Sequence, residues 1–544
     1  MVWTCAVSKS SVSYQELFEN VRGKKILDNP DGHNAAVILT TPSFARDLEN
    51  ADAMGQFARL MAASADVEKF HVLSAVVDHL AAPAGSLRSH EGISVLRGHL
   101  DHMLPHLWQP LSPKSNDDAD SVSALTFSLG DPSVTLPLAR TTFQNSRPST
   151  LLTSEFDLAH SVPRLTQQVE KHSQFVNVSL DHDIESLAYL DMWAPLMPLT
   201  EPRTVTESFG NIIRGIEVDG NTIPASTELE DIVNKLHKQN GPSGVLSGPV
   251  GVWAMVTPDR NTSGALEEWF EEAPEPITAL PDVDDIRETV KATAQHLKLL
   301  YSHGGRLYKI LSGGGGWGAK KGLLSLDPQR AHFSLSEEEE MQNFIQSMNG
   351  GGFTPEGSQI QFFMSAPALP ENTAEPFAPG VVFGVSGDVA VPREADPING
   401  FIGQHFGALS NSAIYLSGQG LPGGKETKLS VPHSRVYSRE PEVKMGAFES
   451  LAYELADAFG GIPTTPFSAL VNMAGTMIPS SRFSSSVTPR RCAVVKDCVT
   501  NAVKPFVSDA KHILRPLAAP ISGEIERSCK TDVSLSPSGN ADSE

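Results

Sequence analysis

The chain has 544 residues, more than one hydrophobic core normally organises, which predicts about two to four domains. Hydrophobic residues make up 40% and charged residues 19% of the chain, and this composition excludes wholesale disorder. Its 64 acidic and 42 basic residues give a net charge of −22. Such a charge excludes a chain-wide phosphate-binding surface and leaves only local basic patches for nucleic acid or membrane.

Residues 1–200 have the pattern of an α/β domain, because short apolar runs alternate with helix-length segments. A helix is predicted over 44–65. The predicted strands are 34–41, 70–77, 122–129 and 174–180.

This order of strands and helices in the N-terminal part is similar to that of the FIST-type sensory domain, an α/β module that binds small ligands. The similarity lies in the layout of the predicted elements, because the sequence holds no motif diagnostic of that family. It implies sensory ligand binding rather than catalysis.

Residues 201–330 are predicted to form a second α/β domain that ends in a glycine-rich loop. A helix at 227–238 begins at Ser226 or Thr227, either of which can cap it. A longer amphipathic helix at 284–303 ends at two glycines. The predicted strands are 212–218, 251–256 and 307–311.

Residues 331–475 are predicted to form an α+β domain, and residues 476–544 a flexible, locally basic tail. The third domain has predicted strands at 359–364 and 381–385, and predicted helices from 336 and over 446–459. The whole chain is therefore predicted to be an α/β (or α+β) multidomain protein, with mixed sheets flanked by helices and a mobile C-terminal tail.

The glycine-rich loop after strand 307–311 is the most conspicuous motif. Consecutive glycines let several backbone N–H groups converge on one anion, and two lysines can neutralise it. It is not a P-loop, because Ala319 stands where Walker A requires lysine and Lys320 where it requires Ser or Thr. The alternative is a flexible tight loop anchored to a neighbouring domain by its tryptophan. The predicted anion- or ligand-binding residues are Gly313, Gly314, Gly315, Gly316, Trp317, Gly318, Lys320 and Lys321.

Two basic segments in the C-terminal third form the predicted surface for a polyanion or partner. One is 425–439, and the other is 482–515, where seven basic residues stand against two acidic ones. The alternative is a solvated charged face. Nucleic acid is expected only through this third of the chain. The predicted contact residues are Arg435, Arg439, Arg490 and Arg491.

The histidines and carboxylates do not predict a metal site, a cofactor or a catalytic residue. On a helix, three histidines would share one face: His99, His102 and His106. Pro105 interrupts this helix and its neighbours are apolar, which indicates an ordinary packed segment, so no metal is predicted. Asp183 and Glu185, after strand 174–180, are better explained as a helix cap and a partner of the helix dipole.

The cysteines and the N-terminus favour an intracellular protein, in the cytoplasm or the mitochondrial matrix. The four cysteines are Cys5, Cys492, Cys498 and Cys529. Their spacing is not that of a disulfide-rich protein. No apolar run reaches the ~18 residues of a transmembrane helix, and the N-terminus lacks the charged start of a secretory signal.

Three functions from different classes fit these patterns. The first is a non-enzymatic accessory or assembly factor that binds a small anionic ligand or a protein partner. The second is an enzyme that acts on a phosphorylated or nucleotide substrate at the glycine-rich loop. The third is an organellar RNA- or ribosome-associated factor. The sequence does not decide whether the protein is an enzyme.

Overall fold

The structure is a computed structural model, and its described residues all belong to the first of two compact units, Met1–Glu442 and Val443–Glu544. The predicted helices from 336 and over 446–459 and the predicted tail 476–544 lie outside them. None of the described helices is both long and apolar enough to cross a membrane. The described residues are 2–8, 17, 32–62, 67–81, 89–109, 123–129, 133–178, 190–240, 251–257, 273–313, 322–327, 354–366, 380–387, 400–403, 405–417 and 427–438.

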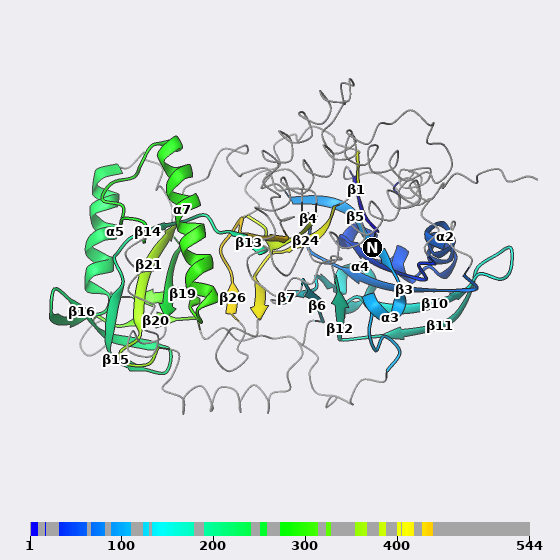
Figure 1. Cartoon of the computed structure of the whole chain (residues 1–544), viewed down its shortest axis with the longest axis horizontal. Helices are drawn as coiled ribbons and strands as arrows, with labels where there is room; N and C mark the ends of the chain where they lie inside the picture. The colour runs from blue at the N-terminus through cyan, green and yellow to red at the C-terminus, as the bar shows by residue number, and fades with distance from the viewer. Residues whose placement is uncertain are drawn as a thin grey trace, which may run out of the picture. The chain divides into compact units, whose positions relative to one another are not determined.

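The first sheet has eight strands in the order β11-β10-β3-β2-β5-β1-β23, with β4 paired to β5 (Figure 1). Only the β2–β3 pair is parallel. Helix α2 (Ala51–Ala62) packs Phe57 and Met61 against Ile38 and Phe70 on one face of this sheet. The strands are β1 (Val2–Ser8), β2 (Ala35–Thr40), β3 (Lys69–Val76), β4 (Leu80–Ala81), β5 (Ser89–Gly98), β10 (Leu151–Asp157), β11 (Arg164–Glu170) and β23 (Gly400–Gly403).

Two smaller sheets share a core with the other face of the first sheet. Their orders are β12-β6-β7-β25-β26 and β13-β27-β22-β24. Phe127 stacks on Phe383 with ring centroids 4.3 Å apart, and Phe406 meets both rings edge-on. The strands are β6 (Ala124–Ser128), β7 (Ser133–Pro137), β12 (Ser173–Asn177), β13 (Leu190–Trp193), β22 (Val381–Val385), β24 (Phe406–Ser410), β25 (Ile414–Ser417), β26 (Thr427–Leu429) and β27 (Arg435–Ser438).

The fourth sheet contains a closed ring of six strands. Strand β18 pairs with both β19 and β21, and the pairings run β21-β15-β16-β20-β19-β18 and back to β21, all antiparallel. Closure leaves no free edge within the ring. The strands are β14 (Leu196–Pro198), β15 (Arg203–Phe209), β16 (Ile212–Val218), β17 (Asn221–Pro224), β18 (Val252–Thr257), β19 (Arg306–Gly313), β20 (Leu324–Leu326) and β21 (Gln359–Ser365).

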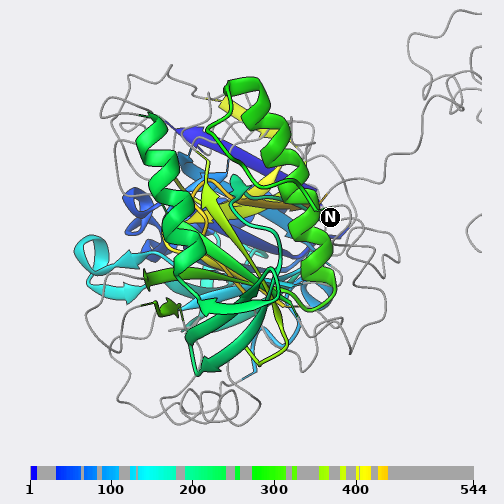
Figure 2. The ribbon, with the colours of Figure 1, turned by 90° about the vertical axis from the view of Figure 1, so that its left-hand side faces the viewer.

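Helices α5 (Thr227–Asn240) and α7 (Val283–Ser302) cover this sheet side by side (Figures 1 and 2). Leu229 of α5 and Val290 of α7 pack against buried strand residues such as Ile216 and Phe362. Helix α7 begins at an N-cap aspartate, Asp282, whose carboxylate accepts hydrogen bonds from two backbone N–H groups of the first turn.

The predicted fold class is confirmed, since mixed sheets flanked by helices make up the described part of the chain. Strands from the range 331–475 lie in several of the sheets: β21 completes the ring, β23 pairs with β1, and β25 pairs with β7. The predicted helix 44–65 is shorter, because two 3₁₀ turns (Pro42–Phe44 and Asp47–Glu49) precede α2.

Arg203→Ala should destabilise the protein by about 2 kcal/mol, because it breaks a half-buried ion pair that fixes the start of α5 to β15. Arg203 donates from Nη2 to Oε1 of Glu228 at 2.6 Å and from Nε to Oε2 at 3.1 Å, and the two side chains are 17% and 15% exposed. Urea unfolding measures the change. Arg214→Ala is the matched control, because its pair with Glu207 is more than half exposed and should contribute about 0.5 kcal/mol or less. Equal losses in the two variants would contradict the prediction.

Candidate functional site

An open groove of about 620 Å³ lies at one end of the strand ring, where β18 begins and β19 and β21 end. The first half of α5 forms one wall. The volume falls in the range of pockets that hold small molecules. The apolar residues that line the groove are Leu229, Val233, Val252, Trp253, Ile310, Leu311, Leu324 and Pro432.

Local sequence determines where the α5 wall stands. The backbone N–H of Ser226 donates to the carbonyl of Gly322 at 3.1 Å, just before the helix begins. Gly322 has a φ of +88°, and a Cβ there would lie 2.5 Å from the Pro224 side chain, so the position requires glycine. The start of α5 is thus fixed to the C-terminal end of the glycine-rich loop.

Among the described residues that line the groove, Lys309 is the one cation and Glu230 the one carboxylate. Lys309 on β19 pairs with Trp253 on β18, and its ammonium lies 5.8 Å from the centroid of the Trp253 ring. The Glu230 carboxylate accepts a 2.5 Å hydrogen bond from the Ser226 hydroxyl.

The Trp253 ring forms a fixed floor beneath Lys309. The residue is 2% exposed, and its indole N–H donates to the Ser430 hydroxyl at 3.3 Å. A Cβ at Gly251 would lie 2.5 Å from the ring, so this glycine lets the backbone pass close to the indole. Lys309 itself is exposed, so its ammonium lies between the Trp253 ring and the solvent.

The glycine-rich loop is described only at its two ends. Gly313 ends β19 and pairs with Leu324 of β20, and Gly322 lies beside Pro224. The next residue before Gly313, Ser312, lines the groove. The other predicted residues of this loop lie outside the described residues, namely Gly314, Gly315, Gly316, Trp317, Gly318, Lys320 and Lys321.

Arg435 does not lie on a surface that a polyanion could reach, so its prediction as a contact residue is corrected. The side chain is 0% exposed and donates through Nη1 to the carbonyl oxygens of Val385 and Ser434 at 2.6 and 2.9 Å. Burial lowers the pKa of Arg435 to about 9. Lys428, in the same basic segment, forms a 2.9 Å ion pair with Asp327. Arg439, Arg490 and Arg491 lie outside the described residues.

The predicted histidine set follows β5, and two of its members, His99 and His102, make ring contacts. His99 precedes the short helix α3 (Leu100–Met103), and its ring lies edge-on to His33 at 4.9 Å and to His102 at 6.4 Å. Across the described ranges, no three His, Cys, Asp or Glu side chains are grouped as a metal ion would need. Asp183 and Glu185 lie outside those ranges.

Sequence reasoning did not find Trp253 and Lys309, two of the residues that line the groove. Each looks ordinary within its own strand, and only the register of β18 against β19 brings them opposite each other. Comparisons of the chain with protein-family models, with curated proteins and with solved structures give no match.

Proposed function

We propose that this protein binds a small molecule with an apolar or aromatic body and one anionic group, in the groove between α5 and the ends of β18 and β19. The observation that carries the proposal is the position of Lys309, an exposed cation above a buried indole in a groove lined by both apolar and polar residues. Small-molecule sites combine apolar walls with a few polar groups that fix orientation. The apolar body would contact the exposed Leu311 side chain, and the anion would meet the Lys309 ammonium.

The polar side chains that line the groove can hold and orient a ligand. They are those of three serines, Asn234, Glu230 and Lys309. The anionic group of the ligand could be a phosphate instead of a carboxylate, because backbone N–H groups of glycine-rich loops bind phosphate and such a loop follows β19. We therefore propose an accessory protein that responds to an anionic ligand.

Lys309→Met should weaken binding of an anionic probe by about fivefold, because an exposed charge pair contributes up to about 1 kcal/mol. The probes are 4-phenylbutyrate, phenyl phosphate and the neutral 4-phenylbutyramide, titrated by saturation-transfer NMR. We expect the wild-type chain to bind an anionic probe more tightly than the amide.

Lys238→Met is the matched control, since Lys238 is exposed in the last turn of α5 and does not line the groove. It should leave the affinity for every probe unchanged, and Lys309→Met should leave the affinity for the amide unchanged. The proposal fails if the anions and the amide bind equally, or if both lysine variants behave alike. A preference for phenyl phosphate over the carboxylate would identify phosphate as the anionic group.

A further inference from the structure

The groove is lined by two opposite charges that are not paired with each other. The Lys309 ammonium lies over the Trp253 ring, and the Glu230 carboxylate accepts a hydrogen bond from the Ser226 hydroxyl. Both charged residues are exposed, and neither forms an ion pair with any residue that the structure describes. The two charges therefore remain available to a molecule that enters the groove.

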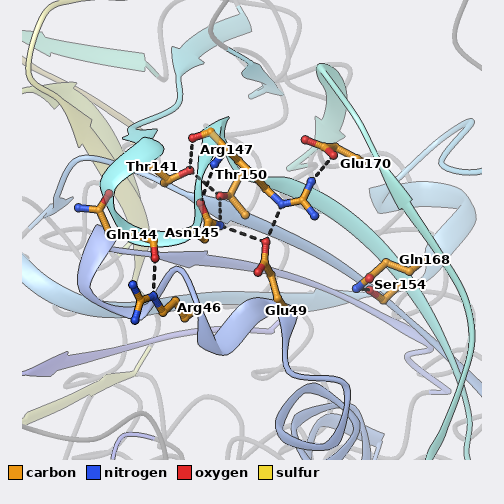
Figure 3. Close-up of polar contacts among 10 residues, drawn as sticks. All are labelled: Arg46, Glu49, Thr141, Gln144, Asn145, Arg147, Thr150, Ser154, Gln168 and Glu170. Carbon is orange, nitrogen blue, oxygen red and sulfur yellow. Dashed lines mark hydrogen bonds and ion pairs between the residues drawn. The ribbon is translucent and has the colours of Figure 1, made fainter.

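Opposite charges that lie close together elsewhere in the chain satisfy each other. Figure 3 shows one example, at a small hairpin formed by β8 (Arg140–Thr141), α4 (Thr142–Asn145) and β9 (Arg147–Ser149). Arg147 donates there to the carboxylate of Glu49 at 2.6 Å and to that of Glu170. In the groove, by contrast, the cation stands on strand β19 and the carboxylate on helix α5. The two charges therefore belong to different walls, and a ligand lying between the walls can meet both.

Helix α5 presents a row of polar side chains to the groove. Ser226 precedes the helix, and Glu230 and Asn234 follow at intervals of four residues, so the three lie along one face. The Ser226 hydroxyl donates to Oε1 of Glu230 at 2.5 Å, which fixes the position of the carboxylate. No described residue donates a hydrogen bond to the second oxygen, Oε2. The row therefore offers a positioned, negatively charged acceptor to a ligand.

A role in the helix explains only part of this arrangement. Carboxylates in the first turn stabilise a helix, and a hydrogen bond from the residue four positions earlier helps to hold them. Glu228 lies in the same first turn and is paired with Arg203 away from the groove. The helix therefore already has a carboxylate at its start, and a helical role alone does not explain why Glu230 faces the groove.

We propose that the ligand of the groove is a zwitterion, with a protonated amine that pairs with Glu230 in addition to the anionic group that meets Lys309. This inference rests on the proposed function, because it takes the anion at Lys309 as given. A simple anion would be repelled by the nearby carboxylate and by the net charge of −22 on the chain. A ligand without net charge avoids this repulsion. An amino acid with an apolar or aromatic side chain is the chemical class that combines these groups.

The test compares ligands that share one carbon skeleton, titrated against the full chain by saturation-transfer NMR. The first, 4-phenylbutyrate, carries the anion alone. Two amino acids, 2-amino-4-phenylbutyrate and 3-amino-4-phenylbutyrate, carry the anion and an amine at two different spacings. We expect at least one amino acid to bind the wild-type chain about fivefold more tightly than 4-phenylbutyrate, because its amine adds one exposed charge pair.

Glu230→Gln should change the two affinities in opposite directions. It should weaken binding of the amino acid by about fivefold, because the charge pair is lost, and tighten binding of 4-phenylbutyrate by up to about twofold, because the repulsion is removed. The amide oxygen can still accept from Ser226, so the melting temperature should stay that of the wild type. Asp231→Asn is the matched control, since Asp231 is exposed on the same helix and does not line the groove. It should leave both affinities unchanged.

The zwitterion proposal is overturned if neither amino acid binds more tightly than 4-phenylbutyrate, or if Glu230→Gln and Asp231→Asn have the same effect on the affinity for the amino acid. It is also overturned if 2-hydroxy-4-phenylbutyrate or 3-hydroxy-4-phenylbutyrate binds as tightly as the corresponding amino acid, because a neutral donor then suffices. In each of these cases, tighter binding of 4-phenylbutyrate than of its neutral amide would still support the proposed function. If no probe binds, both proposals fail.

Discussion

Gly407→Ala should destabilise the fold by about 3 kcal/mol or more, enough to unfold much of a marginally stable protein. Gly407 lies in β24, and a Cβ at this position would stand 1.9 Å from the carbonyl oxygen and 2.8 Å from the carbonyl carbon of Val382. These atoms belong to the backbone of the paired strand β22, so no side-chain rotation can relieve the overlap. The two strands must separate for the methyl group to fit.

The consequence extends beyond one pair of strands, because β24 connects two sheets. The backbone N–H of Gly407 donates to the Ser94 hydroxyl of β5 at 3.2 Å, and Leu409 exchanges backbone hydrogen bonds with His79. Moving β24 away from β22 therefore also strains its contacts with the first sheet. Chemical unfolding followed by circular dichroism measures the loss.

Gly220→Ala is the control for the general cost of replacing a glycine. Gly220 has a φ of +75°, and no atom lies within 4 Å of the point that an added methyl group would occupy, so only backbone strain of about 1 kcal/mol is expected. If Gly407→Ala costs no more than Gly220→Ala, the close approach of β22 and β24 in this structure is wrong.

Two kinds of element can be predicted from the sequence. They are strands made mainly of apolar residues, and elements whose ends carry typical residues such as acidic side chains or glycines. Strands β16 and β22 match their predicted ranges, because β22 is a run of apolar and small residues and β16 is rich in Ile and Val between Gly210 and Gly220. Helices α5 and α7 match within two residues at each end, because acidic residues mark their first turns and glycines follow α7.

The sequence does not predict elements that depend on distant partners. Strand β5 carries His90, Glu91 and Arg97, which read as polar surface, yet Arg97 is 1% exposed because β5 lies between β1 and β2. Arg435 was predicted on the surface for the same reason, since local charge does not reveal burial by another strand. The candidate groove depends on the β18–β19 register, and local patterns contain no information about that register.

Stability should fall as the pH decreases from about 7.5 to 5.5, because three buried histidines are harder to protonate in the folded protein than in the unfolded chain. Burial lowers the pKa of His71, His296 and His405 from 6.5. The unfolded chain takes up protons near pH 6.5, and the folded chain takes them up at these histidines only at a lower pH. The stabilisation is therefore complete above that pH and is lost as the pH falls, by at most about 1.4 kcal/mol per pH unit for each histidine.

His405 is the clearest of the three. It is 0% exposed, and its Nε2 lies 2.9 Å from the carbonyl oxygen of Ala81, so this nitrogen carries the proton of the neutral ring. A second proton would have to go on Nδ1, a buried atom with no hydrogen-bond partner among the described residues. Protonation would thus bury both a charge and an unsatisfied donor next to Phe406 and β24.

His405→Gln should reduce the pH dependence, because an amide can still donate to Ala81 but does not titrate. The free energy of unfolding in urea, measured at about pH 7.5, 6.5 and 5.5, should change less with pH than in the wild type, by up to about 1.4 kcal/mol per unit. His172→Gln, at an exposed position, is the control and should leave the slope as it is in the wild type. The prediction is contradicted if the free energy of unfolding has the same pH dependence in the wild type, His405→Gln and His172→Gln. That result would mean that protonation of His405 costs no stability, so that its ring is not buried between β4 and β24.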